Sequence, residues 1–124
     1  MTVHPTRTCF DDAMDFMELH YKTLAQLCDE RYIIVHAICL MPDGRPYAHA
    51  WVEDNKKGEC IFGGIINGQK VYLFAEKADY YECQQVQDTT KYTIKQAMME
   101  NLLSYSYGPW EQKYLSLTSN FQNG

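Results

Sequence analysis

Apolar residues recur at spacings of three and four through the first part of the chain, which is typical of an amphipathic helix. Thr8 precedes this stretch and Asp11 follows three residues later, as in a helix N-cap with an acidic first turn. The pattern predicts a helix of about five turns that begins at Cys9. Its expected apolar stripe comprises Phe10, Ala13, Met14, Met17, Tyr21, Leu24, Leu27 and Cys28.

The middle of the chain has the composition of an antiparallel sheet. Residues 32–41 are rich in β-branched and aromatic side chains, residues 42–46 have turn composition, and residues 47–53 alternate in character. These segments predict a β-hairpin. Two further strands are expected at 59–66 and 70–74, joined by an Asn-Gly turn.

The register of the first hairpin decides which side chains meet. If its Asp-Gly pair forms the turn centre, Ile38 lies opposite His49 and His36 opposite Trp51, to within one residue. Side chains alternate along a strand, so one face of the second strand is expected to carry four residues. These are Tyr47, His49, Trp51 and Glu53.

The last third of the chain is predicted to be mainly helical. A short helix is expected at 76–85, and Thr93 with Gln96 forms a capping box for a helix that ends near Leu103, before a Gly-Pro pair. Residues 119–124 are expected to fray. The whole predicts an α+β fold in one domain, residues 1–124, with an N-terminal helix packed on an antiparallel sheet and a C-terminal helix.

The charge and composition of the chain limit the classes of partner that it is expected to bind. The net charge of −5 lacks the basic face that nucleic-acid binding requires. The longest apolar stretch, near residues 33–41, is too short to span a bilayer, and residues 1–7 lack the apolar core of a secretion signal. We therefore expect a cytoplasmic protein that binds neither nucleic acid nor membrane. The sequence leaves its oligomeric state open.

The five cysteines are odd in number, widely spaced and free of any Cys-x-x-Cys pair. This pattern favours reduced thiols over disulfides or structural zinc, and no metal or other cofactor is expected. Cys9 stands apart because a thiolate in the first turn of a helix is stabilised by unpaired N–H groups. Two interpretations remain open, since Asp11 and Asp12 oppose ionisation and most cysteines serve only in packing.

His49 is the second candidate, because a strand imidazole can take a thiol proton and return it to a leaving amine. Trp51 is expected beside it. His36 is either a second imidazole of the site or a histidine packed on an aromatic ring. Glu53 is either a site neighbour or a solvated strand end.

Two motifs carry a family resemblance. Cys9-Phe10-Asp11-Asp12-Ala13 resembles the Cys-x-Asp-x-Ala helix start of transglutaminase-like members of the papain-like cysteine protease superfamily. His49-Ala50-Trp51-Val52-Glu53 resembles their His-Ala-Trp-Val-Glu strand, and small uncharacterised bacterial and phage proteins share that strand. The resemblance extends over residues 9 to 110.

This resemblance implies a papain-like core and a cysteine-dependent hydrolase, deamidase or acyltransferase. A protein or peptide amide would react through a thioester on Cys9, with His49 as the base. The families also place an Asp or Asn on the strand after the histidine strand, but Gly63 and Gly64 occupy that region here. Asn67 is the nearest candidate orienter, although Asn-Gly is also a turn signal. The alternative function is a catalytically degenerate papain-like fold that binds protein.

Overall fold

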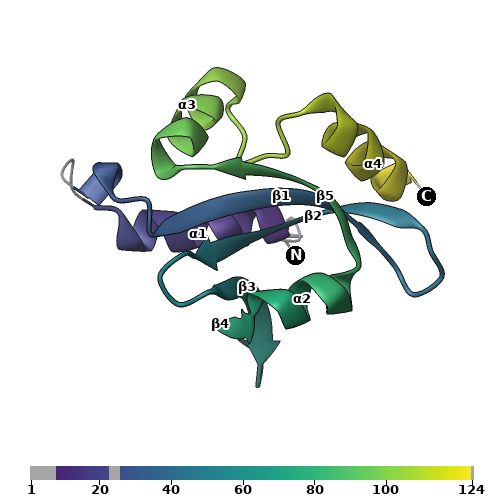
Figure 1. The fold of residues 1–124 in the computed structure, drawn as a ribbon. Coiled ribbons are helices and arrows are strands. Elements are labelled where there is room, and N and C mark those ends of the chain that lie inside the picture. Colours follow the sequence, from purple (N-terminus) through teal and green to yellow (C-terminus); the bar gives the residue numbers. More distant parts are fainter. Residues whose placement is uncertain (1–7, 23–25, 124) are drawn as a thin grey trace.

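The computed structural model describes residues 8–22 and 26–123, which form an antiparallel sheet with helices on both faces (Figure 1). The coarse α+β class expected from the sequence is confirmed. In chain order the elements are α1 (Cys9–His20), the 3₁₀ turn η1 (Gln26–Cys28), β1 (Tyr32–Leu40), β2 (Pro46–Asp54), β3 (Glu59–Ile66), β4 (Gln69–Glu76), α2 (Lys77–Gln84), β5 (Val86–Tyr92), α3 (Ile94–Ser104) and α4 (Gln112–Asn123).

The strand order is β4-β3-β2-β1-β5, and every neighbouring pair is antiparallel. The predicted β1–β2 hairpin is confirmed, but its register is shifted by one residue from the expected one. Ala37, and not Ile38, lies opposite His49. The cause is a five-residue loop in which Met41 donates its N–H to the Arg45 carbonyl at 2.8 Å, so Asp43-Gly44 is not a two-residue turn centre.

Strands β2 and β3 diverge after a short paired segment. Only Val52–Asp54 of β2 pairs with Glu59–Ile61 of β3, whereas β3 pairs with β4 along its whole length. The residues of β2 that precede Val52 are therefore hydrogen-bonded to a neighbouring strand on one side only, and that strand is β1. We call the space between the diverging strands the wedge.

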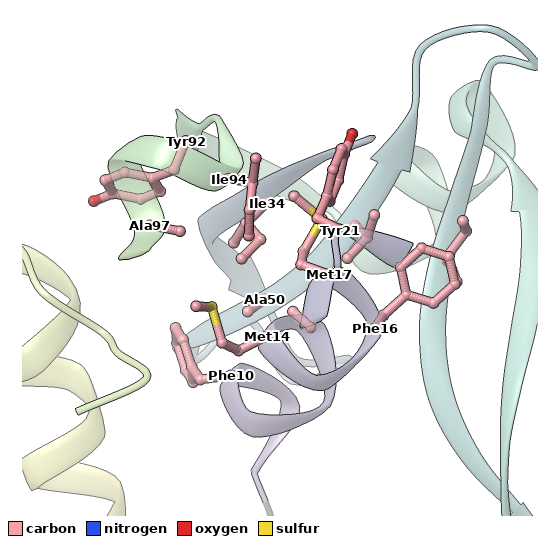
Figure 2. Close-up of a cluster of buried hydrophobic side chains, with 13 residues drawn as sticks. Phe10, Met14, Phe16, Met17, Tyr21, Ile34, Ala50, Tyr92, Ile94 and Ala97 are labelled. Atoms are coloured by element: carbon pink, nitrogen blue, oxygen red, sulfur yellow. The ribbon is translucent and has the colours of Figure 1, made fainter. Parts of the chain in front are cut away.

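Each face of the sheet has its own apolar cluster. The α1 face carries a cluster built from α1, α3 and the side chains of the sheet that point towards them (Figure 2). The α2 face carries a second cluster, in which Tyr80 of α2 packs on sheet residues. The sheet residues of this second cluster are Val35, Ala37, Cys39, Trp51 and Cys60.

Helix α1 begins at Cys9 as expected, and Thr8 with Asp11 forms a complete capping box. It ends much earlier than the apolar stripe predicted, at His20. Tyr21 is the C-cap, and its hydroxyl accepts a hydrogen bond from the Tyr32 N–H at 3.0 Å, which joins this helix end to β1. The later apolar positions of the stripe belong to η1, except for Leu24, which lies outside the described residues.

Two C-terminal elements depart from the sequence-based expectation. Strand β5 was not predicted, and it adds an outer strand beside β1. The expected frayed tail is wrong for residues 119–123, whose backbone continues α4 as far as Asn123.

No described helix is both long and apolar enough to span a membrane.

Candidate functional site: a thiol and an imidazole at the wedge

Cys9 is the first residue of α1 and lies at the wedge. Its side chain is half-buried and packs against the α1-face cluster. The backbone N–H of Ala50 interacts with the Cys9 sulfur, as do the N–H groups of Cys9 and Phe10. Since Ala50 directly follows His49 in β2, the thiol lies beside the peptide bond that joins those two residues.

Burial is the main reason that the pKa values of Cys39, Tyr47 and Tyr80, on the opposite face of the sheet, are raised, and an ionised Cys9 would raise them further. Tyr47 and Tyr80 are ring neighbours of His49, at centroid distances of 5.7 and 6.2 Å.

Burial raises the pKa of the Cys9 thiol to about 11, and the negative charge of Asp12 adds to this effect. The N–H groups of Ala50, Cys9 and Phe10 act in the opposite direction, because they stabilise the thiolate. Burial is the largest of these effects, so the helix start does not by itself ionise the thiol. Cys9 is therefore a neutral thiol at pH 7.

His49 lies on the α2 face, half-buried between aromatic rings. Its Nε2 forms a hydrogen bond with the Tyr80 hydroxyl at 2.8 Å, and its ring lies 5.4 Å from that of Trp51. Burial lowers the pKa of His49 to about 4, so the imidazole is neutral at pH 7 and able to accept a proton. In the described part of the chain, the Cys9 thiol and the His49 ring make no direct hydrogen bond.

Trp51 and Glu53 share the face of His49, as the strand alternation predicted. Glu53 is only 1% exposed, so its interpretation as a solvated strand end is wrong. Its carboxylate accepts hydrogen bonds from the Trp51 indole and the Tyr81 hydroxyl and forms ion pairs with Lys77 and Lys91 at 3.4 and 3.1 Å. Glu53 therefore joins β2 to α2 and β5 and fixes the indole beside His49.

His36 is not a second imidazole of this site. It lies opposite Ala50, one residue away from the predicted partner Trp51, and consequently faces α1 and α4. Its ring packs against Phe10 and Trp110, each at a centroid distance of 4.8 Å. The alternative interpretation, a histidine packed among aromatic rings, describes it correctly.

The region expected to supply a third catalytic group, residues 63–67, is fully described and holds none. Asn67 is exposed at the tip of the β3–β4 hairpin and has a φ of 53°, followed by Gly68 with a φ of 78°. These values fit its role in a tight turn. At Gly63 the space of a side chain is filled by the Asp12 carboxylate, since a Cβ there would lie 2.7 Å from the Asp12 Cγ.

Tyr80 is the member of this arrangement that is not among the site residues predicted from the sequence. It belongs to α2, and 31 positions separate it from His49. No periodicity links a helix position to a particular strand residue, so only the packing of α2 on the sheet reveals the contact. Within the described segments, no group of three His, Cys, Asp or Glu side chains converges as a metal site would require.

In comparisons with known proteins, no family model, curated protein or solved structure matches this chain.

Proposed function

We propose that this protein is a cysteine-dependent amide hydrolase, deamidase or acyltransferase with a papain-like core, in which Cys9 is the nucleophile and His49 the base. One observation carries the proposal. The thiol at the start of α1 lies against the Ala50 N–H at the open edge of β2, next to the residue that bears the imidazole. Thioester chemistry requires a thiol and an imidazole that reach the same substrate carbonyl, and the proposal gives these roles to the helix-start Cys9 and the strand residue His49.

General-base catalysis starts from a protonated thiol and a neutral imidazole, but pKa values of about 11 for Cys9 and about 4 for His49 oppose transfer of the proton before the sulfur attacks. At neutral pH the thiol is protonated and the imidazole is neutral. Substrate binding at the wedge brings the Cys9 proton to His49 as the sulfur attacks the amide carbonyl. The tetrahedral oxyanion collapses to a thioester, and the imidazolium returns the proton to the leaving amine.

The second half of the reaction depends on what reaches the thioester. Water, deprotonated by His49, releases a carboxylic acid and the free thiol, whereas an amine gives a new amide. The Ala50 N–H and the N–H groups of the first turn of α1 supply hydrogen-bond donors close to the sulfur, where an oxyanion would develop. None of these steps needs a cofactor.

A catalytically degenerate papain-like domain that binds protein is the second candidate. Two observations favour it. Burial holds the Cys9 pKa near 11. In the region of β3 where the orienting acid was expected, Gly63 has no side chain, and the Asp12 carboxylate fills the space beside it. An inert thiol and a packed imidazole would then be structural features of a binding module.

The two candidates predict different alkylation of Cys9 across a pH series. A buried thiol without a base reacts with iodoacetamide ever faster as the pH rises towards about 11. A thiol with a working base has an additional, faster component near neutral pH. The modified cysteine is identified by peptide mass spectrometry, and the exposed Cys83 serves as an internal reference thiol.

His49→Ala is the decisive variant in this experiment. We expect it to remove the near-neutral component at Cys9 and to leave alkylation of Cys83 unchanged. Acylation of Cys9 by p-nitrophenyl acetate should show the same dependence on His49. If Cys9 reacts no faster near neutral pH in the wild-type protein than in His49→Ala, the enzyme proposal fails and the binding module is favoured.

A further inference from the structure

The imidazole of His49 has a defined partner, and among the described residues that partner is a tyrosine hydroxyl and not a carboxylate. Its Nε2 and the Tyr80 hydroxyl are 2.8 Å apart. The Tyr80 side chain is only 5% exposed and stacks on the Phe62 ring, at a centroid distance of 4.7 Å and an interplanar angle of 29°. The Trp51 ring meets it edge-on at 5.2 Å. The phenol is therefore held by β2 and β3 together.

The contacts around Tyr80 fix α2 on the sheet. The next residue, Tyr81, donates its hydroxyl to Glu53, and Lys77 at the start of α2 forms an ion pair with the same carboxylate. Glu53 is fully buried and also accepts from the Trp51 indole. These bonds determine where α2 lies and hence where the Tyr80 hydroxyl points.

We propose that Tyr80 is the positioning residue of this site, and that its hydroxyl holds Nε2 of His49 so that Nδ1 is left to receive the Cys9 proton. This proposal rests on the proposed function. The proton moves from Sγ of Cys9 to Nδ1, while the Nε2 proton stays in place and is donated to the Tyr80 oxygen. The geometry assigns to α2 the role that an acid on the following strand has in the families that the motifs resemble.

A phenol in this position differs chemically from a carboxylate. Burial raises the pKa of Tyr80, so the hydroxyl stays neutral. A neutral oxygen accepts the Nε2–H bond and orients the ring, but it adds no negative charge to stabilise an imidazolium. Because the Tyr80 oxygen carries no charge, it orients the imidazole without opposing the effect of burial, which lowers the pKa of His49 to about 4.

The test compares Tyr80→Phe with Tyr81→Phe. Both remove one hydroxyl from neighbouring residues of α2, but the first loses the bond to His49 and the second the bond to Glu53. The phenyl ring that Tyr80→Phe leaves in place retains the stacking on Phe62. Two quantities are measured in each variant: the ¹⁵N chemical shifts of the His49 ring, which report its tautomer, and the His49-dependent alkylation rate of Cys9.

We expect Tyr80→Phe to shift the His49 tautomer equilibrium and to lower the His49-dependent rate by about 10-fold to 100-fold, as is typical when an orienting partner is lost. Tyr81→Phe should leave both quantities near their wild-type values. If Tyr80→Phe changes neither the ring shifts nor the rate, the positioning role of Tyr80 is overturned while the proposed function still holds. The absence of any His49-dependent rate in the wild-type protein instead overturns the proposed function.

Discussion

His36 and His49 are two imidazoles on opposite faces of the sheet, and they differ in how their polar atoms are satisfied. His49 has the Tyr80 hydroxyl as its partner, whereas both ring nitrogens of His36 are buried without a hydrogen bond to any described residue. Burial lowers the pKa of His36 to about 3. The titratable groups packed on its ring are Tyr92 and Tyr114, whose own pKa values are raised by burial.

This burial predicts acid sensitivity. The unfolded chain titrates His36 near pH 6.5, whereas the folded protein takes up that proton only near pH 3. Between these values the unfolded state binds more protons, so the stabilisation that comes from His36 is fully present above pH 6.5 and is lost as the pH is lowered. At pH 5 the loss from this one group is about 2 kcal/mol.

His36→Phe should remove that contribution while keeping an aromatic ring in place. We expect the difference in unfolding free energy between pH 7.5 and pH 5, measured by urea denaturation, to shrink by about 2 kcal/mol. Part of the pH dependence should persist, because burial also lowers the pKa of His49. Parallel curves for the wild-type protein and the variant would contradict the prediction.

At Gly63, the Asp12 side chain of α1 lies close against β3. A Cβ there would overlap the carboxylate of Asp12, which is also held by Lys70 through an ion pair at 2.8 Å. We expect Gly63→Ala to destabilise the protein by about 1–3 kcal/mol, as overpacking usually does. The measurement is a double-mutant cycle with Asp12→Ala, in which the cost of Gly63→Ala should fall sharply. Simple additivity would show that the clash is relieved elsewhere.

Single residues were predicted well where local rules decide and poorly where packing decides. The helix start at Cys9 and the shared face of His49 and Trp51 follow from capping and alternation. The surroundings of His36 depended on a one-residue register, which a five-residue loop shifted. The contact between Tyr80 and His49 depends on how α2 crosses the sheet, which no local pattern in the sequence encodes.

Among the elements, those with strong terminal signals were predicted best. The strands β1 to β4 match their predicted segments to within about two residues, and α3 begins after Thr93 as its capping box predicted. The end of α1 was misjudged because the apolar spacing continues past His20, while the chain leaves the helix at Tyr21. Strand β5 was missed because its sequence is polar, as befits an edge strand exposed along one side.

The capping box of α3 provides a test at this scale. The Thr93 hydroxyl accepts from the Gln96 N–H at 3.2 Å, and the Gln96 side chain accepts from the Thr93 N–H at 2.9 Å. Thr93→Ala should therefore cost about 1 kcal/mol of unfolding free energy. Thr93→Ser keeps the oxygen and should cost less. Equal losses in the two variants, measured by thermal denaturation, would mean that the methyl group and not the cap matters.

At the scale of the whole molecule, the sheet is unevenly paired. β1 is bonded to β2 on one side and to β5 on the other, and both apolar clusters pack on it. By contrast, β4 is an outer strand, and the end of β3 has only β4 as a neighbour within the described sheet. This difference is tied to the candidate site, because Ala50, whose N–H interacts with the Cys9 sulfur, lies in the part of β2 that β3 does not pair with.

Native-state hydrogen exchange measures this asymmetry directly. Amides of β1 are expected to exchange only through global unfolding, because opening them disrupts both clusters. Amides in the part of β3 near Gly64 and in β4 should exchange faster, through local opening of the β3–β4 hairpin. The Ala50 amide is the informative case, since its N–H faces the Cys9 sulfur and has no β3 partner. Protection of Ala50 that falls in Cys9→Ala would show that the thiol closes the open edge of β2, whereas unchanged protection would mean that burial alone shields it.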